Sequence, residues 1–383
     1  MMSSGFAIAL SAFGLAPVWA AQLVDSETIY WEAVAQYASG DRATALKDIG
    51  SFGAKDLDEV ADAVEKLARA AKKCEDCEAR RQFDALPLRA AVLLHAQRDR
   101  ADRAFRMKQT NGTPDCLVSA QGTAAERLLG FVDPQRGGTA FVASFSLAIA
   151  LDSRSMLCYL RASHWAEVGL KAAPENAALL TARGLAAETM GVTGWAEPTP
   201  VMIYDNLSRN DPRRGGRTVM RSTPVDKTRL LNVARESFEK AIALDPNQEE
   251  ARVRLGRVLW RLGRMKEARE RLVKAVELGK ENVTTYLAHL FLGKCLEDSQ
   301  DLNGAIEEYK IAVSLRPELQ MGAVALAHAL TLRGDAEGAR QVLEPALAYS
   351  GNRRAEDPYW WYLVGSPDLS DALLESLRLE LTR

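Results

Sequence analysis

Two cysteines, Cys74 and Cys77, form the Cys-x-x-Cys spacing that most directly suggests chemistry in this chain. A redox-active pair of this type sits in a strand-to-helix turn, and no strand pattern surrounds it. Covalent haem attachment requires a following histidine, but Glu78 stands there. A zinc site needs further ligands. The nearest candidates are His95, Cys116, Cys158 and His164. We expect neither a metal nor a cofactor.

Structural disulfides are the interpretation that best fits these cysteines in an exported protein. The simplest pairing joins Cys74 to Cys77 and Cys116 to Cys158, but three pairings are possible and the sequence does not choose among them. Free thiols and a metal site stay open as alternatives. Cys295 follows an apolar helical pattern and is expected to be a small buried residue.

No catalytic constellation is visible. The four histidines include His95 on an apolar helical stretch and His164 before a tryptophan, positions typical of core or surface groups. The chain lacks a metalloprotease helix motif, a nucleophile elbow and a phosphate loop. We therefore expect no catalytic residues. An enzyme with a site near Cys74, Cys77 and His95 is the least favoured alternative.

A short sequence block recurs in the second half of the chain, and its period predicts the helices that carry the residues there. It consists of an alanine, a bulky residue four positions later and a small residue three positions after that. Its first members follow one another after 34, 37 and 34 residues, a period typical of stacked helical hairpins. Its copies are Ala234/Phe238/Ala241, Ala268/Leu272/Ala275, Ala305/Tyr309/Ala312 and Ala339/Leu343/Ala346.

Each block is preceded by a small residue and a turn, as Gly256 and Gly263 precede Ala268. This order resembles the tetratricopeptide repeat. The resemblance implies an all-α, right-handed superhelical solenoid of antiparallel helical hairpins. Small residues allow the two helices to approach closely, and we expect the bulky residue to fill the space between neighbouring hairpins. The departures are Lys280 where proline is common, Gln300 where glycine is common, and three extra residues before Gly293.

The same register divides the chain. A repeat that begins at Pro174 has its second helix only at Ala234, so residues 192–226 are expected to be an insert. The aromatic run Tyr359–Tyr362 is expected to cap the array. The expected regions are a signal peptide (1–20), a divergent helical region (21–173) with a degenerate hairpin at 28–52, an interrupted repeat (174–246), the repeat array (247–350), and an aromatic cap with a terminal helix (351–383).

The resemblance also implies a binding face, because the first helix of each hairpin lines a concave groove in this family. The residues carried onto those positions are Arg257, Trp260, Arg261, Lys294, Glu297, Asp298 and His328. Their aromatic and charged side chains suit a peptide or protein partner. A solvated charged face is the alternative. The insert could supply a basic contact arm, or be a loop folded over the solenoid. The arginines of the arm are Arg209, Arg213, Arg214, Arg217 and Arg221.

Composition and the N-terminus indicate the compartment and exclude some partners. Lys and Arg (49) nearly balance Asp and Glu (51), so we expect no nucleic acid partner. The first 20 residues are uncharged and end in Val18-Trp19-Ala20, which resembles a signal-peptidase site, although no basic residue precedes the apolar run. We expect export to the periplasm or cell envelope, and no membrane span after signal removal. The sequence does not fix the oligomeric state.

Three classes of function follow. The leading hypothesis is a non-enzymatic scaffold that presents the groove to a peptide or protein. The alternative is a structural subunit of an envelope assembly that uses its outer surface and the basic insert. An enzyme comes third.

Overall fold

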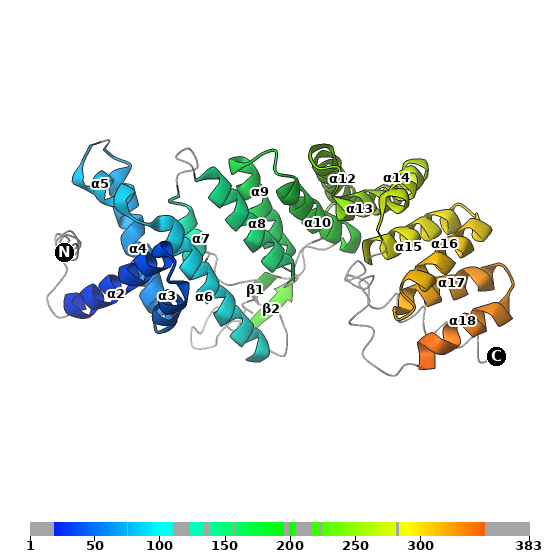
Figure 1. Ribbon diagram of the computed structural model, residues 1–383, viewed down its shortest axis with the longest axis horizontal. Helices are drawn as coiled ribbons and strands as arrows, with labels where there is room; N and C mark the ends of the chain where they lie inside the picture. Colours follow the sequence, from blue (N-terminus) through cyan, green and yellow to red (C-terminus); the bar gives the residue numbers. More distant parts are fainter. Residues whose placement is uncertain are drawn as a thin grey trace. The chain divides into compact units, whose positions relative to one another are not determined.

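The computed structural model describes nine stretches of the chain: 19–74, 76–109, 123–132, 138–155, 158–194, 199–203, 217–221, 224–280 and 283–348. The predicted all-α fold of antiparallel helical hairpins is confirmed (Figure 1). The chain divides into two compact units, residues 1–144 and 145–383. The candidate signal peptide up to residue 18 and the expected cap at 351–383 lie outside the described residues.

The N-terminal unit is built from three long helices, α2, α4 and α6, and three short ones, α3, α5 and α7, and it ends within α8, which crosses the boundary. Tyr30 is at the centre of its core and packs edge-to-face on Phe52, with ring centroids 6.3 Å apart. Sequence periodicity did not predict α5 and α7. The helices are α2 (Trp19–Ser39), α3 (Arg42–Gly50), α4 (Ala54–Ala71), α5 (Glu78–Ala85), α6 (Leu88–Gln109), α7 (Ala124–Leu129) and α8 (Thr139–Ser155).

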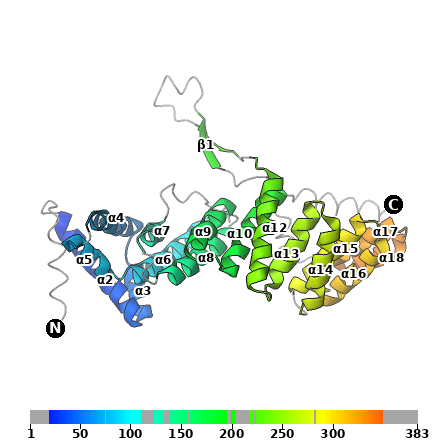
Figure 2. The ribbon, with the colours of Figure 1, turned by 90° about the horizontal axis from the view of Figure 1, so that it is seen from above.

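The second unit continues with helices that pair along the chain (Figure 2). We call α10, α13, α15 and α17 the inner helices, and α12, α14, α16 and α18 the outer helices. Their bounds are α9 (Tyr159–Ala172), α10 (Ala177–Thr193), α12 (Lys227–Leu244), α13 (Glu249–Arg261), α14 (Met265–Leu278), α15 (Val283–Asp298), α16 (Leu302–Leu315), α17 (Gln320–Leu332) and α18 (Ala336–Ala348).

Glycines on the inner helices fix how closely each hairpin packs. A Cβ atom added to Gly256 would lie 2.5 Å from the Leu272 side chain of α14. The same addition at Gly293 would lie 2.4 Å from Tyr309. Leu272 and Tyr309 therefore pack inside their own hairpins, each against the glycine of its inner helix. Our expectation that the bulky residue fills the space between neighbouring hairpins is corrected for these two, because the missing glycine side chain leaves room for them within the hairpin.

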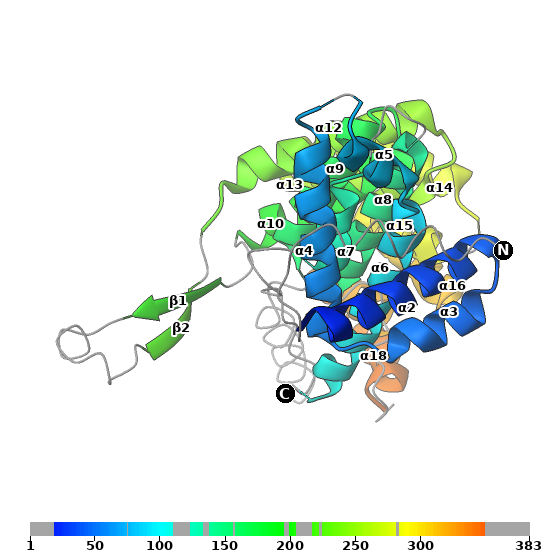
Figure 3. The same cartoon turned by 90° about the vertical axis from the view of Figure 1, so that its left-hand side faces the viewer.

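The interrupted repeat closes across its insert. A Cβ added to Gly184 of α10 would lie 2.5 Å from the Phe238 ring of α12, which repeats the Gly256–Leu272 contact. Between these helices the chain forms two antiparallel strands, β1 (Thr199–Ile203) and β2 (Arg217–Arg221), paired with Val201 opposite Val219 (Figure 3). Sequence analysis did not predict this β-hairpin. Strand pairing satisfies backbone groups that an open loop would leave to water.

The turns between paired helices share one hydrogen-bonding pattern. At Gly263, φ is +75°; its N–H donates to the Trp260 carbonyl, and the next N–H, that of Arg264, donates to Leu259. Gly334 and Gly40 repeat both the positive φ and the paired bonds. Gln300 takes the place of the glycine in the turn between α15 and α16, with φ +64°. A residue with a Cβ therefore adopts the left-handed conformation there. The Gly40 turn joins α2 to α3, where a degenerate repeat is expected.

Candidate partner-binding groove

The candidate site is the side of the inner helices that carries Glu188, Trp260, Glu297 and Thr331, each four residues after the small residue that faces the outer helix. We call this side the inner face. Successive inner helices contact one another, α10 with α13, α13 with α15 and α15 with α17. Equivalent positions are therefore brought side by side along the array.

Trp260 begins a polar network on the inner face. Its indole Nε1 donates to Asp298 Oδ2 of α15 at 2.8 Å. The Arg261 guanidinium lies 4.5 Å from the centroid of the Trp260 ring, a cation–π arrangement. The ring is therefore fixed by its N–H and by the cation, which makes it a preorganised aromatic anchor.

Lys294 connects Asp298 to the next carboxylate of the network. Its Nζ lies 2.8 Å from Asp298 Oδ1 and 2.5 Å from Glu297 Oε1. Burial lowers the pKa of Lys294, but the hydrogen bonds to both carboxylates outweigh it, and the pKa is raised overall. Lys294 is thus held as a cation between two acids, half-buried on the inner face.

Glu297 extends the network to two further helices. The Tyr309 hydroxyl of α16 donates to its Oε2 at 3.2 Å, and His328 Nδ1 of α17 lies 3.4 Å from the same oxygen. Burial raises the pKa of Glu297, but the hydrogen bonds from His328 and Lys294 outweigh it and lower the pKa. Six of the seven predicted groove residues thus form one network across α13, α15 and α17.

Arg257, the seventh, is not an exposed groove residue. Its side chain is 2% exposed, and its Nη1 lies 2.6 Å from Glu188 Oε1 of α10. The guanidinium also lies 5.5 Å from the Phe291 ring centroid of α15. The expectation of an accessible cation is corrected, because a buried carboxylate on the preceding inner helix neutralises it.

Glu188 and Arg254 are the residues that sequence reasoning missed. Glu188 is fully buried, and its Oε2 accepts from Arg254 at 2.7 Å. Burial raises the pKa of Glu188, but the charges of Arg254 and Arg257 outweigh it and lower the pKa. The available signal was register, since Glu188 stands four residues after Gly184 as Trp260 does after Gly256. We call Glu188, Arg254 and Arg257 the buried charge cluster.

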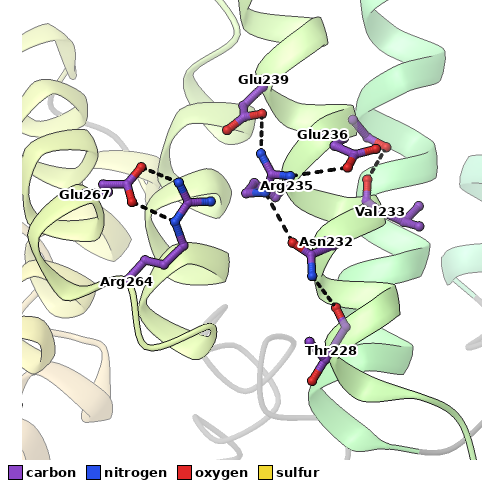
Figure 4. A network of polar contacts seen from close by, with 9 residues as sticks. Thr228, Asn232, Val233, Arg235, Glu236, Glu239, Arg264 and Glu267 are labelled. Carbon is purple, nitrogen blue, oxygen red and sulfur yellow. Dashed lines mark hydrogen bonds and ion pairs between the residues drawn. The ribbon is translucent and has the colours of Figure 1, made fainter.

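The outer helices carry a different, solvent-facing set of ion pairs (Figure 4). On α12, Arg235 donates to Glu239 at 2.8 Å and to Glu236 at 3.2 Å. Arg264, the residue before α14, donates from Nη2 to Glu267 of that helix at 2.6 Å. Exposed pairs of this kind contribute little stability and describe a solvated surface.

The predicted cysteine and basic-arm residues are placed as follows. A disulfide joins Cys74 to Cys77, with the Cα atoms 6.0 Å apart. Cys158 is disulfide-bonded, and Cys116 lies outside the described residues. Cys295 is a buried free thiol. Arg217 and Arg221 are the ends of β2. Outside the described residues lie Arg209, Arg213 and Arg214.

The N-terminal unit buries its histidine instead of exposing it. His95 is fully buried, and the Tyr30 hydroxyl lies 2.7 Å from its Nδ1. Burial lowers the pKa of His95 to about 4, so the imidazole is neutral. In the described part of the chain, no group of three or more His, Cys, Asp or Glu side chains is arranged to hold a metal ion. None of the helices described there is long and apolar enough to cross a membrane.

Comparison with known proteins identifies the repeats. The tetratricopeptide repeat family model matches residues 231–290, which run from α12 into α15. Residues 231–290 are tetratricopeptide repeats. The assignment agrees with the close contact between Gly256 and Leu272 and with the positive φ of Gly263 in the turn between α13 and α14. It covers the part of the inner face that holds Trp260 and Arg261.

Solved structures give weaker likenesses. A crystal structure of MamA protein is 20% identical over 55% of this chain and 92% of its own, with a TM-score of 0.39. A structure titled for the functional characterization of pilF from Pseudomonas aeruginosa is 16% identical over 64% of this chain and 100% of its own, with a TM-score of 0.42. These low scores carry no argument about function. No curated protein matches the chain.

Proposed function

We propose that this chain is an exported, non-enzymatic interaction protein whose inner face binds a peptide or protein partner. The observation that carries the proposal is the Trp260–Asp298–Lys294–Glu297–His328 network. It holds an aromatic anchor and fixed charges side by side on consecutive inner helices. Aromatic and charged groups held in place before binding lose little conformational entropy on association. Repeat arrays generally present such extended faces to partners.

A cross-linking capture from the cell-envelope fraction tests this proposal. Trp260→Ala removes the anchor, and loss of a central aromatic contact costs about 2 kcal/mol or more, roughly thirtyfold in affinity. The matched control is Lys266→Glu, an exposed change on the outer helix α14. We expect capture to fall for Trp260→Ala and to persist for the control. Equal capture by both, with equal melting temperatures, would refute a role for the inner face.

A structural role through the outer helices is the second candidate, and one feature favours it. Leu244 and Leu278 occupy equivalent positions at the ends of α12 and α14, and both are exposed. Apolar side chains repeated on one surface are typical of an interface. Leu244→Glu with Leu278→Glu should abolish assembly, measured by light scattering, if this surface is the contact. Assembly unaffected by these changes would eliminate the candidate.

Export is the remaining part of the proposal. The uncharged first 20 residues support it, as does the Cys74–Cys77 disulfide, because disulfides persist in oxidising compartments. N-terminal sequencing of the protein purified from a fractionated cell tests it. Cleavage after Ala20 is the expected result. An intact N-terminus in the cytoplasmic fraction would contradict it.

A further inference from the structure

The insert between α10 and α12 begins and ends at one closed point. The backbone N–H of Val225 donates to the carbonyl of Gly194 at 3.1 Å. Gly194 is the C-cap of α10, and its φ of +77° lies in the left-handed region that glycine adopts most readily. Asp226, next to Val225, is the N-cap of α12. Both ends of the insert are therefore anchored on the helices of one repeat.

The strands β1 and β2 of the insert form a ribbon with two free edges (Figure 3). Among the described elements, no third strand lies beside them and no helix packs along either of them. A two-stranded ribbon is only marginally stable by itself in water. The unpaired N–H and C=O groups of an edge strand are a template for pairing with another chain. A strand supplied by a partner would therefore stabilise the ribbon.

The hydrogen-bond pattern leaves the edge of β2 able to pair. Pro200 stands opposite Met220 and has no N–H, so these two residues cannot exchange a pair of hydrogen bonds. Bonded and non-bonded pairs alternate along antiparallel strands, so the backbone groups of Thr218 and Met220 point to the free side of β2. On the free side of β1 the proline leaves a gap, which opposes addition of a strand there. We call the free side of β2, with the N–H and C=O groups of Thr218 and Met220, the open edge.

The register also determines which residues share a face of the ribbon. Arg217, Val219 and Arg221 of β2 lie on one face, together with Val201 and Ile203 of β1. A strand that pairs with the open edge places its own alternate residues beside the three residues of β2. Opposite charges and apolar pairs are the favourable cross-strand neighbours. The complementary segment therefore has an acidic, an apolar and a second acidic residue at every other position.

We propose that the open edge of β2 binds an extended acidic segment of a partner protein as a third strand. The main-chain groups of Thr218 and Met220 hold the segment, and Arg217 and Arg221 select its two acidic residues. Strand addition of this kind takes affinity from main-chain hydrogen bonds and specificity from alternate residues. A second copy of β2 does not suit the edge, because it would place arginines beside arginines. The open edge is separate from the inner face, so this inference stands independently of the proposed function.

The experiment uses the full chain and a fluorescent peptide, Thr-Glu-Thr-Val-Thr-Glu-Thr, which carries the complementary pattern. Met220→Pro removes an N–H of the open edge and keeps the arginines, whereas Arg217→Glu with Arg221→Glu reverses the charges and keeps the N–H groups. The matched control, Arg269→Glu with Arg271→Glu, makes the same change of charge at exposed positions of α14. We expect anisotropy to show about tenfold weaker binding or less for both changes in β2, because each removes one of the two kinds of contact. The control should bind like wild type, and all variants should keep the helical circular dichroism and melting temperature.

The outcomes that contradict the inference differ from one another. Wild type that does not bind the peptide would eliminate the site. Binding that survives Met220→Pro but not the reversed arginines would show charge attraction without strand pairing. Equal loss in the α14 control would assign the binding to the net charge of the chain. A peptide with lysines in place of the glutamates should not bind wild type, and equal binding of both peptides would refute selection of acidic residues. A wild-type dimer that Met220→Pro dissociates would assign the open edge to a second copy.

Discussion

Replacing Glu188 with glutamine removes the negative charge that two buried arginines share. The carboxylate lies 2.7 Å from Arg254 and 2.6 Å from Arg257, and it is fully buried. Arg254 also pairs with Glu250 at 2.9 Å, so the change bears mainly on Arg257. Glutamine has nearly the same volume as glutamate, so the perturbation is one of charge and not of packing.

The expected loss is about 3–5 kcal/mol of unfolding free energy, the range found when one partner is removed from a buried ion pair. A native domain has about 5–15 kcal/mol in total, so the variant would be close to unfolding. The triple variant Glu188→Leu, Arg254→Met, Arg257→Met removes all three charges of the buried charge cluster and nearly keeps the volume, and it leaves only the exposed Glu250 without its partner. It should cost far less than the single change, or stabilise the protein, because no ion remains to be desolvated.

Urea unfolding followed by circular dichroism measures both variants, since an uncharged denaturant does not screen ion pairs. The pH dependence supplies a second check. Burial raises the pKa of Glu188, but the two arginines outweigh it, so the folded pKa lies below the ordinary 4.5. The stabilisation is therefore present above about pH 4.5 and is lost as the pH falls through the folded pKa. A single variant that loses less than about 1 kcal/mol, or a triple variant that loses as much as the single one, would refute the reasoning.

Three further predictions concern the turns, the hairpin contacts and the buried histidine. Gln300→Gly should raise the unfolding free energy by about 0.5–1 kcal/mol, because φ is +64° there; unchanged urea midpoints would contradict it. Gly293→Ala should lower the unfolding free energy by about 1–3 kcal/mol, because the added Cβ would collide with the Tyr309 ring. Gly50→Ala is the control, because nothing lies within 4 Å of its added Cβ, and it should be neutral or stabilising. Equal melting temperatures for the two variants would contradict this explanation. Burial holds the pKa of His95 near 4, so the unfolded chain takes up a proton at a higher pH than the folded protein. About 3 kcal/mol of unfolding free energy should therefore be lost as the pH falls from 6.5 to 4. His95→Gln should make stability less dependent on pH in this range, and an equally steep profile would disprove the prediction.

The sequence predicted the regular hairpins because their packing requires specific residue sizes at fixed positions. A glycine on the inner helix and a bulky residue on the outer helix must meet, as Gly256 and Leu272 do. That requirement repeats with the hairpin and is visible as the 34-residue step. Gly184 and Phe238 satisfy it across the insert, which is why the interrupted repeat could be recognised.

The hairpin of α8 and α9 escaped detection for a related reason. Ala150, Ala162 and Gly169 stand at the repeat spacing before Gly184, but Ala166 occupies the position of the bulky residue. In the structure, large side chains come from other positions, Phe145 of α8 and Trp165 of α9, whose ring centroids lie 6.3 Å apart. Neighbouring positions can thus fill the space between two helices, and a search for large residues at one fixed position does not detect such a hairpin.

The strands of the insert were missed because each is only five residues long and their pairing is not local in sequence. Thr199–Ile203 reads as a short apolar run with a proline, without a clear alternation. A two-stranded ribbon of this length has little sequence signal apart from its turn.

The inner face illustrates what a repeat pattern determines and what it leaves open. Glu188, Trp260 and Glu297 stand at one register position, yet the first is a buried anion, the second an aromatic anchor and the third a link between helices. The position of a residue in the repeat determines on which side of its helix it lies. Whether that residue is buried depends on its partners, and the partner that buries Arg257 is Glu188, which lies 69 residues earlier and before the insert. The charge cluster closes the inner face between α10 and α13, and the face opens toward Leu332. A partner that follows this face would therefore contact the stretch from Trp260 to Leu332.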